Sequence, residues 1–134
     1  MRLNGASRPV RARSQSRNGI HLPSKTVIVA IARDPALLRS LVFALDAHGY
    51  RVAAFPSWRA ARESARFASL VILDDCLSPA DKEACLAVLG PGVPVLLLAE
   101  HDVVHAERPG LRILPKPLSG PDVVDTVAAL RRSA

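Results

Sequence analysis

The sequence predicts a doubly wound α/β domain, in which a five-stranded parallel sheet lies between two layers of helices. Short apolar runs alternate along the chain with segments of helical spacing, a pattern typical of β–α–β units. The runs are continuously apolar, so each strand is expected to be covered on both faces. Right-handed crossovers between successive strands then give a three-layer α/β/α sandwich. With 134 residues, 49% of them hydrophobic and 4% aromatic, the chain fits one domain with an aliphatic core.

Five apolar runs predict the strands. They are residues 27–31, 50–55, 70–73, 95–98 and 111–114. The second run is short and depends on Tyr50, Val52 and Phe55, whereas the others are continuous. Between the fourth and fifth runs, residues 100–110 leave room for only a turn or two of helix, because Pro109 and Gly110 end it early.

Capping residues followed by apolar residues at helical spacing predict the helices. Asp34 stands directly before a proline, which together make a strong helix start. Ser57, Ser78 and Ser119 begin three further helices, and Ser78 is followed three positions later by the acidic Asp81. The first three helices are expected to end near Gly49, Phe67 and Gly90. The side chains expected to face the sheet are Leu37, Leu38, Leu41, Val42 and Leu45 in the first helix, Ala84, Cys85, Val88 and Leu89 in the third, and Val123, Val124, Val127 and Leu130 in the last.

The excess positive charge of the chain lies in its first 25 residues. The net charge is +6, yet residues 1–25 hold six basic residues and no acidic one, while the rest holds 12 of each sign. Residues 1–25 also lack apolar periodicity, so we expect a disordered basic tail followed by one domain over residues 26–132. The tail has no aromatic residue for base stacking, which argues against nucleic acid as the partner. A nucleic-acid-associated protein that binds through this tail stays open as an alternative class.

The remaining reactive side chains suggest no metal or disulfide chemistry. Cys76 and Cys85 have neither a zinc spacing nor a disulfide framework, so reduced thiols and a cytoplasmic location are expected. Cys76 is a candidate redox sensor, but neighbouring carboxylates are expected to leave it an ordinary thiol. His101 and His105 have helical spacing without a third ligand, which favours an exposed pair over a metal site. No apolar stretch reaches the roughly 18–20 residues of a membrane span, so no membrane insertion is expected.

Charged residues follow two of the predicted strands. Asp74 and Asp75 come directly after the third apolar run, and Lys116 follows the fifth, between two prolines. In an open parallel α/β sheet, the carboxyl ends of the strands form the edge at which ligands bind. The sequence therefore predicts a pocket at this edge that contains at least one carboxylate and one ammonium group.

The order of elements, with an acid after the third strand and Lys116-Pro117 after the fifth, resembles the receiver domain of two-component response regulators. The resemblance covers about residues 26–130 and implies the flavodoxin-like (receiver) topology. It implies that Asp74, or Asp75 as second choice, accepts a phosphoryl group from a histidine kinase and that Lys116 contacts the phosphoryl oxygens. It also implies an acid pair after the first strand that holds Mg²⁺, a hydroxyl residue after the fourth, and often a cis peptide bond before Pro117.

Several positions depart from this pattern. Ala32 and Arg33 stand where the resemblance implies the acid pair, and Arg33 places a cation where Mg²⁺ would bind. Ala99 stands at the hydroxyl position and Ile113 at a position that is often aromatic, while Asp34 is expected to cap a helix. These departures argue against Mg²⁺, leave no confident metal site and no cofactor, and indicate a degenerate, pseudo-receiver version of the domain.

We therefore predict a stand-alone receiver-like domain of a bacterial two-component phosphorelay, impaired in phosphorylation and not an enzyme. It would act by contact with a histidine kinase or another signalling protein, or with a second copy of the chain as a homodimer, since no output domain fits after Arg132. We further hypothesise that Arg33 and Lys116 together neutralise Asp74 and Asp75 in place of the metal. Two alternatives stay open: a working single-domain response regulator phosphorylated on Asp74, and a small α/β enzyme that uses both acids and the lysine.

Overall fold

A parallel sheet forms the middle layer of the protein. The computed structural model describes residues 27–90, 92–100 and 110–133. The strands are β1 (Val27–Ile31), β2 (Arg51–Phe55), β3 (Leu70–Asp74), β4 (Val95–Ala99) and β5 (Leu111–Pro115), in the order β2-β1-β3-β4-β5. All four neighbouring pairs are parallel, which confirms the doubly wound fold class. The predictions for the basic tail over residues 1–25, and for His101 and His105, lie outside the described residues.

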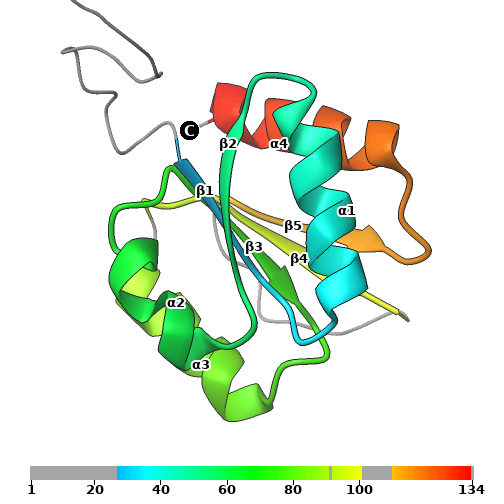
Figure 1. Ribbon diagram of the computed structural model, residues 1–134. Helices are drawn as coiled ribbons and strands as arrows, with labels where there is room; N and C mark the ends of the chain where they lie inside the picture. Colours follow the sequence, from blue (N-terminus) through cyan, green and yellow to red (C-terminus); the bar gives the residue numbers. More distant parts are fainter. Residues whose placement is uncertain (1–26, 91, 101–109, 134) are drawn as a thin grey trace, which may run out of the picture.

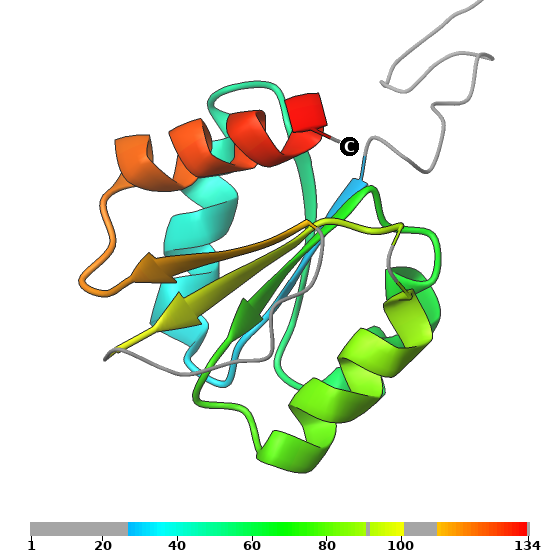
Figure 2. The same cartoon turned by 180° about the vertical axis from the view of Figure 1, so that it is seen from behind.

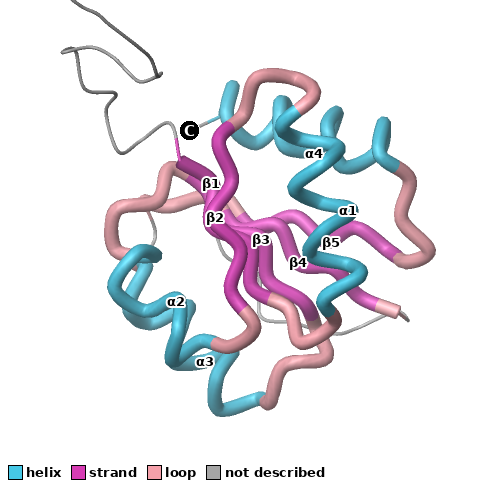
Figure 3. Tube along the Cα trace, viewed as in Figure 1, coloured by secondary structure: helices cyan, strands magenta, loops and turns pink. Residues whose placement is uncertain are grey.

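Helices cover both faces of this sheet. In the described part of the chain they are α1 (Pro35–Asp46), α2 (Trp58–Ala65), α3 (Pro79–Leu89) and α4 (Gly120–Ser133). Figures 1 and 2 show α1 and α4 packed side by side on one face, with α2 and α3 on the other. The tube in Figure 3 shows the strands running between these two layers, as the predicted three-layer sandwich requires. None of these helices is long and apolar enough to cross a membrane.

Each helix begins at the residue that the sequence predicts. A capping oxygen accepts a hydrogen bond from a backbone N–H of the first turn, where no carbonyl of the helix is available. The four bonds are Asp34 Oδ1 with Ala36 N at 2.9 Å, Ser57 Oγ with Ala60 N at 3.1 Å, Ser78 Oγ with Asp81 N at 3.1 Å and Ser119 Oγ with Asp122 N at 3.1 Å. The caps fix where each chain segment leaves the carboxyl edge of the sheet, so they also set the geometry of that edge.

The apolar side chains of the strands supply two separate cores. Alternate residues of a strand point to opposite faces, so Val29 and Ile31 pack under α2 and α3, while Ile28 and Ala30 pack under α1 and α4. Every residue of β3 and β4 is buried, as their continuous apolar sequences predict. The central strands are thus held rigidly from both sides, which gives the residues at their ends fixed positions.

Two expected helix details are wrong. Val88 was expected to face the sheet but is 48% exposed, because the buried face of α3 is centred between Cys85 and Leu89, with Leu86 packing beside them. Val88 lies about 100° around the helix from Leu89, on the opposite side from Leu86. Helix α2 ends at Ala65 rather than near Phe67, and the Phe67 side chain is 62% exposed.

The end of α4 is tied to the amino ends of β1 and β3. Arg131 Nη1 donates a hydrogen bond to Ser69 Oγ at 3.3 Å, and Ser69 Oγ donates to the Val27 carbonyl oxygen at 3.0 Å. The Arg131 guanidinium also lies 5.5 Å from the centre of the Tyr50 ring, within range of a cation–π interaction. These contacts join segments that are far apart in the sequence.

Replacing Arg131 by alanine is therefore expected to lower the free energy of unfolding by about 1 kcal/mol, since one hydrogen bond and one cation–π contact are lost. Urea unfolding followed by circular dichroism measures the loss. The neighbouring Arg132 is exposed and serves as the matched control, with a change of less than about 0.5 kcal/mol expected for Arg132→Ala. Equal losses of unfolding free energy in the two variants would contradict a stabilising role for the Arg131 contacts.

Candidate functional site

The carboxyl edge of the sheet brings the candidate residues together. Backbone hydrogen bonds continue each strand pairing by one residue, from Ala32 N to Phe55 O at 3.1 Å, from Asp75 N to Leu98 O at 2.8 Å and from Lys116 N to Ala99 O at 2.8 Å. The residues just past β1, β3 and β5 are therefore held by the sheet itself and not by free loops. The peptide bond between Lys116 and Pro117 is cis, as the resemblance implied.

Asp74 and Lys116 form an ion pair at this edge. Lys116 Nζ lies 2.7 Å from Asp74 Oδ1, so the structure joins the first-choice acid with the predicted lysine. Asp74 is the last residue of β3 and is only 2% exposed, whereas the Lys116 side chain is 20% exposed. The distance is that of a charge-assisted contact between an ammonium and a carboxylate. A buried carboxylate held in this way depends on the ammonium for its charge balance.

The same contacts keep Lys116 protonated. Burial by itself lowers the pKa of Lys116, but the hydrogen bond with Asp74 and the negative charge of that carboxylate outweigh it, with smaller contributions from Cys76 and Glu100. The net effect raises the pKa of Lys116 above its ordinary value of 10.5. Lys116 therefore carries a full positive charge throughout the physiological pH range.

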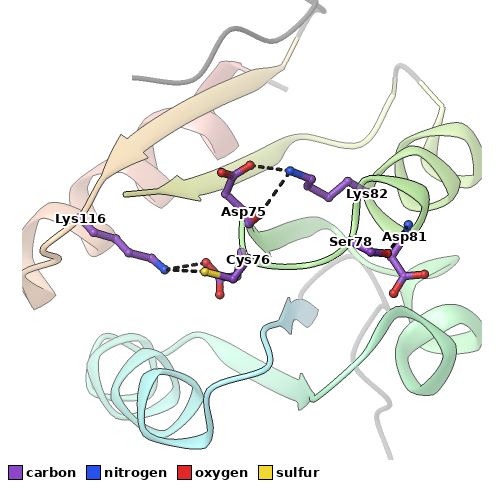
Figure 4. Close-up of polar contacts among 7 residues, drawn as sticks. Asp75, Cys76, Ser78, Asp81, Lys82 and Lys116 are labelled. Carbon is purple, nitrogen blue, oxygen red and sulfur yellow. Dashed lines mark hydrogen bonds and ion pairs between the residues drawn. The ribbon is translucent and has the colours of Figure 1, made fainter. Parts of the chain in front are cut away.

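Asp75, the second-choice acid, is directed away from Lys116. Its Oδ1 lies 2.6 Å from Lys82 Nζ on α3, and Lys82 also donates to the Asp75 backbone carbonyl at 3.3 Å (Figure 4). Lys82 lies about one helical turn beyond the Ser78 cap, which places its ammonium over the loop that follows β3. The structure thus separates the two adjacent acids into two ion pairs with different lysines.

The expected contribution of Arg33 is not found. Its side chain is exposed, and within the described residues it makes no ion pair with Asp74 or Asp75. Arg33 lies in the bend between β1 and α1, and the positions beside the two acids are occupied by Lys116 and Lys82. The structure therefore does not show the contact of Arg33 with these acids that the hypothesis expects, whereas it places Lys116 beside Asp74.

The residues at the end of β1 do not fit Mg²⁺. Ala32 is buried and offers no oxygen, Arg33 brings a positive charge, and Asp34 Oδ1 accepts the capping hydrogen bond from Ala36. Magnesium requires several oxygen ligands in near-octahedral positions. No group of three or more His, Cys, Asp or Glu side chains that could hold a metal ion occurs among the described residues. Ala99, buried at the end of β4, supplies no hydroxyl group.

Cys76 lies at the same edge of the sheet. Its Sγ is 4.0 Å from Lys116 Nζ, the ammonium that also pairs with the carboxylate of Asp74, and Figure 4 shows this ammonium directed toward the sulfur. The thiol is exposed, whereas Cys85 is buried in α3. The sequence shows that Cys76 lies two residues after Asp74, but only the fold shows that both side chains contact Lys116.

A cavity of about 350 Å³ adjoins the ion pair. It lies between α1 and the segment that follows β5, with Leu37, Leu41 and Leu118 among its apolar walls. Lys116 and Glu100 contribute charged groups to the same cavity. The edge of the sheet therefore combines a buried ion pair with a neighbouring partly apolar hollow.

The chain has a relative among curated proteins. No family model matches the chain. A curated relative, the transcriptional regulator protein FixT of Rhizobium meliloti (strain 1021), is 32% identical over 113 residues, which cover 81% of this chain and 95% of the relative.

Solved structures of receiver domains share the fold. A response regulator receiver domain protein from Bacillus halodurans superposes with a TM-score of 0.67 at 17% identity, covering 78% of this chain and 95% of that one. A response regulator receiver protein from Sinorhizobium medicae also gives a TM-score of 0.67, at 21% identity, covering 81% of this chain and 95% of that one. The fold is therefore that of response-regulator receiver domains, and by its sequence the chain belongs to the same family as the regulator FixT.

Proposed function

We propose that this protein is a signalling regulator that uses the receiver fold for protein–protein contact and does not accept a phosphoryl group on Asp74. The proposal rests on the charged groups at the carboxyl edge, where the Asp74 carboxylate is already neutralised by the Lys116 ammonium. Asp74 is buried and already paired with Lys116, and the positions of an acid pair hold Ala32 and Arg33. Phosphoryl transfer to a carboxylate needs a metal to neutralise the developing charge, and these residues offer that metal no ligand set.

A histidine kinase or another signalling protein is the partner that this proposal implies. The relative FixT is described as a transcriptional regulator, and the matched region spans 95% of its length. The region shared with this chain therefore accounts for nearly all of that regulator. We infer that this chain likewise regulates through the surface of its receiver-like domain, without a catalytic step of its own.

Incubation with acetyl phosphate and Mg²⁺ tests the proposal. We expect no mass increase of one phosphoryl group on the intact chain, and no saturable backbone amide shifts around Asp74 at low-millimolar Mg²⁺, because Ala32 and Arg33 offer the metal no carboxylate at the end of β1. Intact mass spectrometry and NMR titration provide the two measurements. A purified histidine kinase with ATP serves as a second phosphodonor, and amide shifts without phosphorylation would map the contact surface.

Stoichiometric phosphorylation that disappears in an Asp74→Asn variant would overturn the proposal. It would support the alternative of a working single-domain response regulator phosphorylated on Asp74. Asp75→Asn is the matched control, because Asp75 is paired with Lys82. This substitution is expected to change neither the intact mass after incubation nor the response of the amide shifts to Mg²⁺.

A further inference from the structure

The outer face of α1 carries an apolar stripe that no part of the described chain covers. Phe43 is 79% exposed, and Val42 beside it is partly exposed. Leu41 and Leu45 form the buried side of the same helix, so the core does not need the Phe43 ring. Helix α1 lies between α4 and β2, an edge strand of the sheet (Figure 1). Exposed aromatic rings of this kind are enriched where proteins contact one another.

An open hollow of about 440 Å³ adjoins the stripe. Four apolar residues from α1 and β2 line it, namely Leu38, Val42, Phe43 and Ala54. Its other lining residues are Arg39 and Asp46, which carry opposite charges. The surface therefore offers an apolar side chain a place to pack, with a positive and a negative group beside it.

The two charged residues of α1 lack counter-charges in their own chain. Within the described residues, neither Arg39 nor Asp46 forms an ion pair. Asp46 is the last residue of the helix, where the partial negative charge of the helix end disfavours an acid, and the last turn holds no basic residue. A cation from another molecule beside Asp46 would offset this repulsion.

The order of these residues makes the stripe complementary to itself. Arg39, Val42, Phe43 and Asp46 follow helical spacing and lie along one side of α1. Arg39 comes three residues before Val42, and Asp46 comes three residues after Phe43. Two such helices can pack antiparallel about a twofold axis that passes between positions 42 and 43. Val42 of each copy then faces the partner's Phe43, and Arg39 of each copy faces the partner's Asp46.

We propose that this face of α1 binds a second copy of the chain, with the two helices antiparallel. The inference goes beyond the proposed function and does not depend on it. The Phe43 ring of each copy packs on the hollow of the other, and two ion pairs flank the rings. Helix α1 has 12 residues and is about 18 Å long, so the contact falls short of the roughly 1,200 Å² of a stable interface. The dimer therefore exchanges readily with the monomer.

Sedimentation velocity of the full chain, at concentrations up to the millimolar range, tests the proposal. We expect the wild type to shift from monomer toward dimer as the concentration rises. Phe43→Ser should lower the association constant about 100-fold, because the twofold axis removes both central rings at once. Phe67→Ser is the matched control: Phe67 is also exposed, but it follows α2 in the opposite helix layer, so its replacement should leave association unchanged.

Charge reversal tests the antiparallel arrangement. In Arg39→Asp both interchain ion pairs become contacts between acids, and in Asp46→Arg both become contacts between arginines. Each variant alone should therefore associate about tenfold more weakly than the wild type. In an equimolar mixture, the acids of one variant face the arginines of the other, so association close to that of the wild type should return.

A wild type that stays monomeric over the whole concentration range would overturn the proposal, and this measurement needs no variant to fold. Equal association of Phe43→Ser and Phe67→Ser would also overturn it, because the contact would then lie elsewhere. A mixture of the charge variants that associates no better than either variant alone would overturn the antiparallel arrangement. Loss of histidine-kinase binding in Phe43→Ser, with the wild type monomeric throughout, would assign this face to that partner instead.

Discussion

Lys116→Met is expected to destabilise the protein by about 3–5 kcal/mol, the cost of leaving a buried charge without its partner. Asp74 is 2% exposed, and Oδ1 has no hydrogen bond to replace the lost ion pair. Removing the Asp74 carboxylate instead costs much less, because Lys116 is partly exposed and its ammonium can then be hydrated. Asp74→Asn is therefore expected to change the free energy of unfolding by less than about 1 kcal/mol. Urea unfolding of both variants measures the difference.

The double variant Asp74→Asn with Lys116→Met identifies the cause. Most of the stability lost in Lys116→Met should return when the carboxylate is also removed, because no buried charge remains unpaired. Lys82→Met provides a matched control: it breaks the ion pair with Asp75, whose side chain is 24% exposed and can be hydrated. A cost of about 1 kcal/mol is expected there. If Lys116→Met were as mild as this control, Asp74 would not depend on Lys116.

The dependence of stability on pH provides a further check of the same pair. The pKa of Lys116 is raised in the folded protein above 10.5, so folding favours its protonated form. The stabilisation is fully present below the unfolded-state value of 10.5 and is lost as pH rises through the higher folded-state value. The gap in unfolding free energy between wild type and Lys116→Met should therefore narrow only above pH 10.5. Narrowing near neutral pH would show that a group other than the Lys116 ammonium stabilises the folded state.

Local sequence patterns predicted the strands and the starts of the helices because short-range physics determines both. The apolar run over residues 27–31 became β1 without any change of bounds. Ser57 and Ser78 cap their helices because each hydroxyl oxygen lies within reach of an N–H three residues later. The meeting of Asp74 with Lys116 was also predictable, since β3 and β5 both end at the same edge of a parallel sheet.

Contacts that depend on side-chain direction could not be predicted in this way. Asp74 and Asp75 are adjacent in sequence, yet one is buried beside Lys116 and the other pairs with Lys82 on α3. Alternation along an extended chain separates the two acids, but only the position of α3 decides which cation the second one meets. The contact of Cys76 with Lys116 was missed for the same reason, because that lysine is distant in sequence and the contact depends on how the loop after β3 turns.

Converting both Ala32 and Arg33 to aspartate is expected to create a magnesium site at the end of β1. The change removes a cation and places two carboxylates just past β1, where the sheet holds the backbone through the Ala32–Phe55 hydrogen bond. Without metal, the variant should lose roughly 1–3 kcal/mol of stability, because position 32 is buried and would hold an unpaired polar group. Magnesium at one hundred times its dissociation constant should return about 2.7 kcal/mol. Thermal unfolding with and without Mg²⁺, and calorimetric titration, measure the two effects.

The neutral variant with asparagine at both positions separates charge from shape. It has nearly the same volume as the aspartate variant, but asparagine is a far weaker magnesium ligand than a carboxylate, so its unfolding should not respond to Mg²⁺.

Phosphorylation by acetyl phosphate adds a functional readout. If the missing acids alone prevent transfer to Asp74, then the aspartate variant should gain it and the asparagine variant should not. Magnesium binding without phosphorylation would instead show that Lys116, already paired with a buried carboxylate, or Ala99, which lacks a hydroxyl group, also blocks the reaction. A wild-type response to Mg²⁺ equal to that of the aspartate variant would refute the proposal that residues 32 and 33 prevent Mg²⁺ binding.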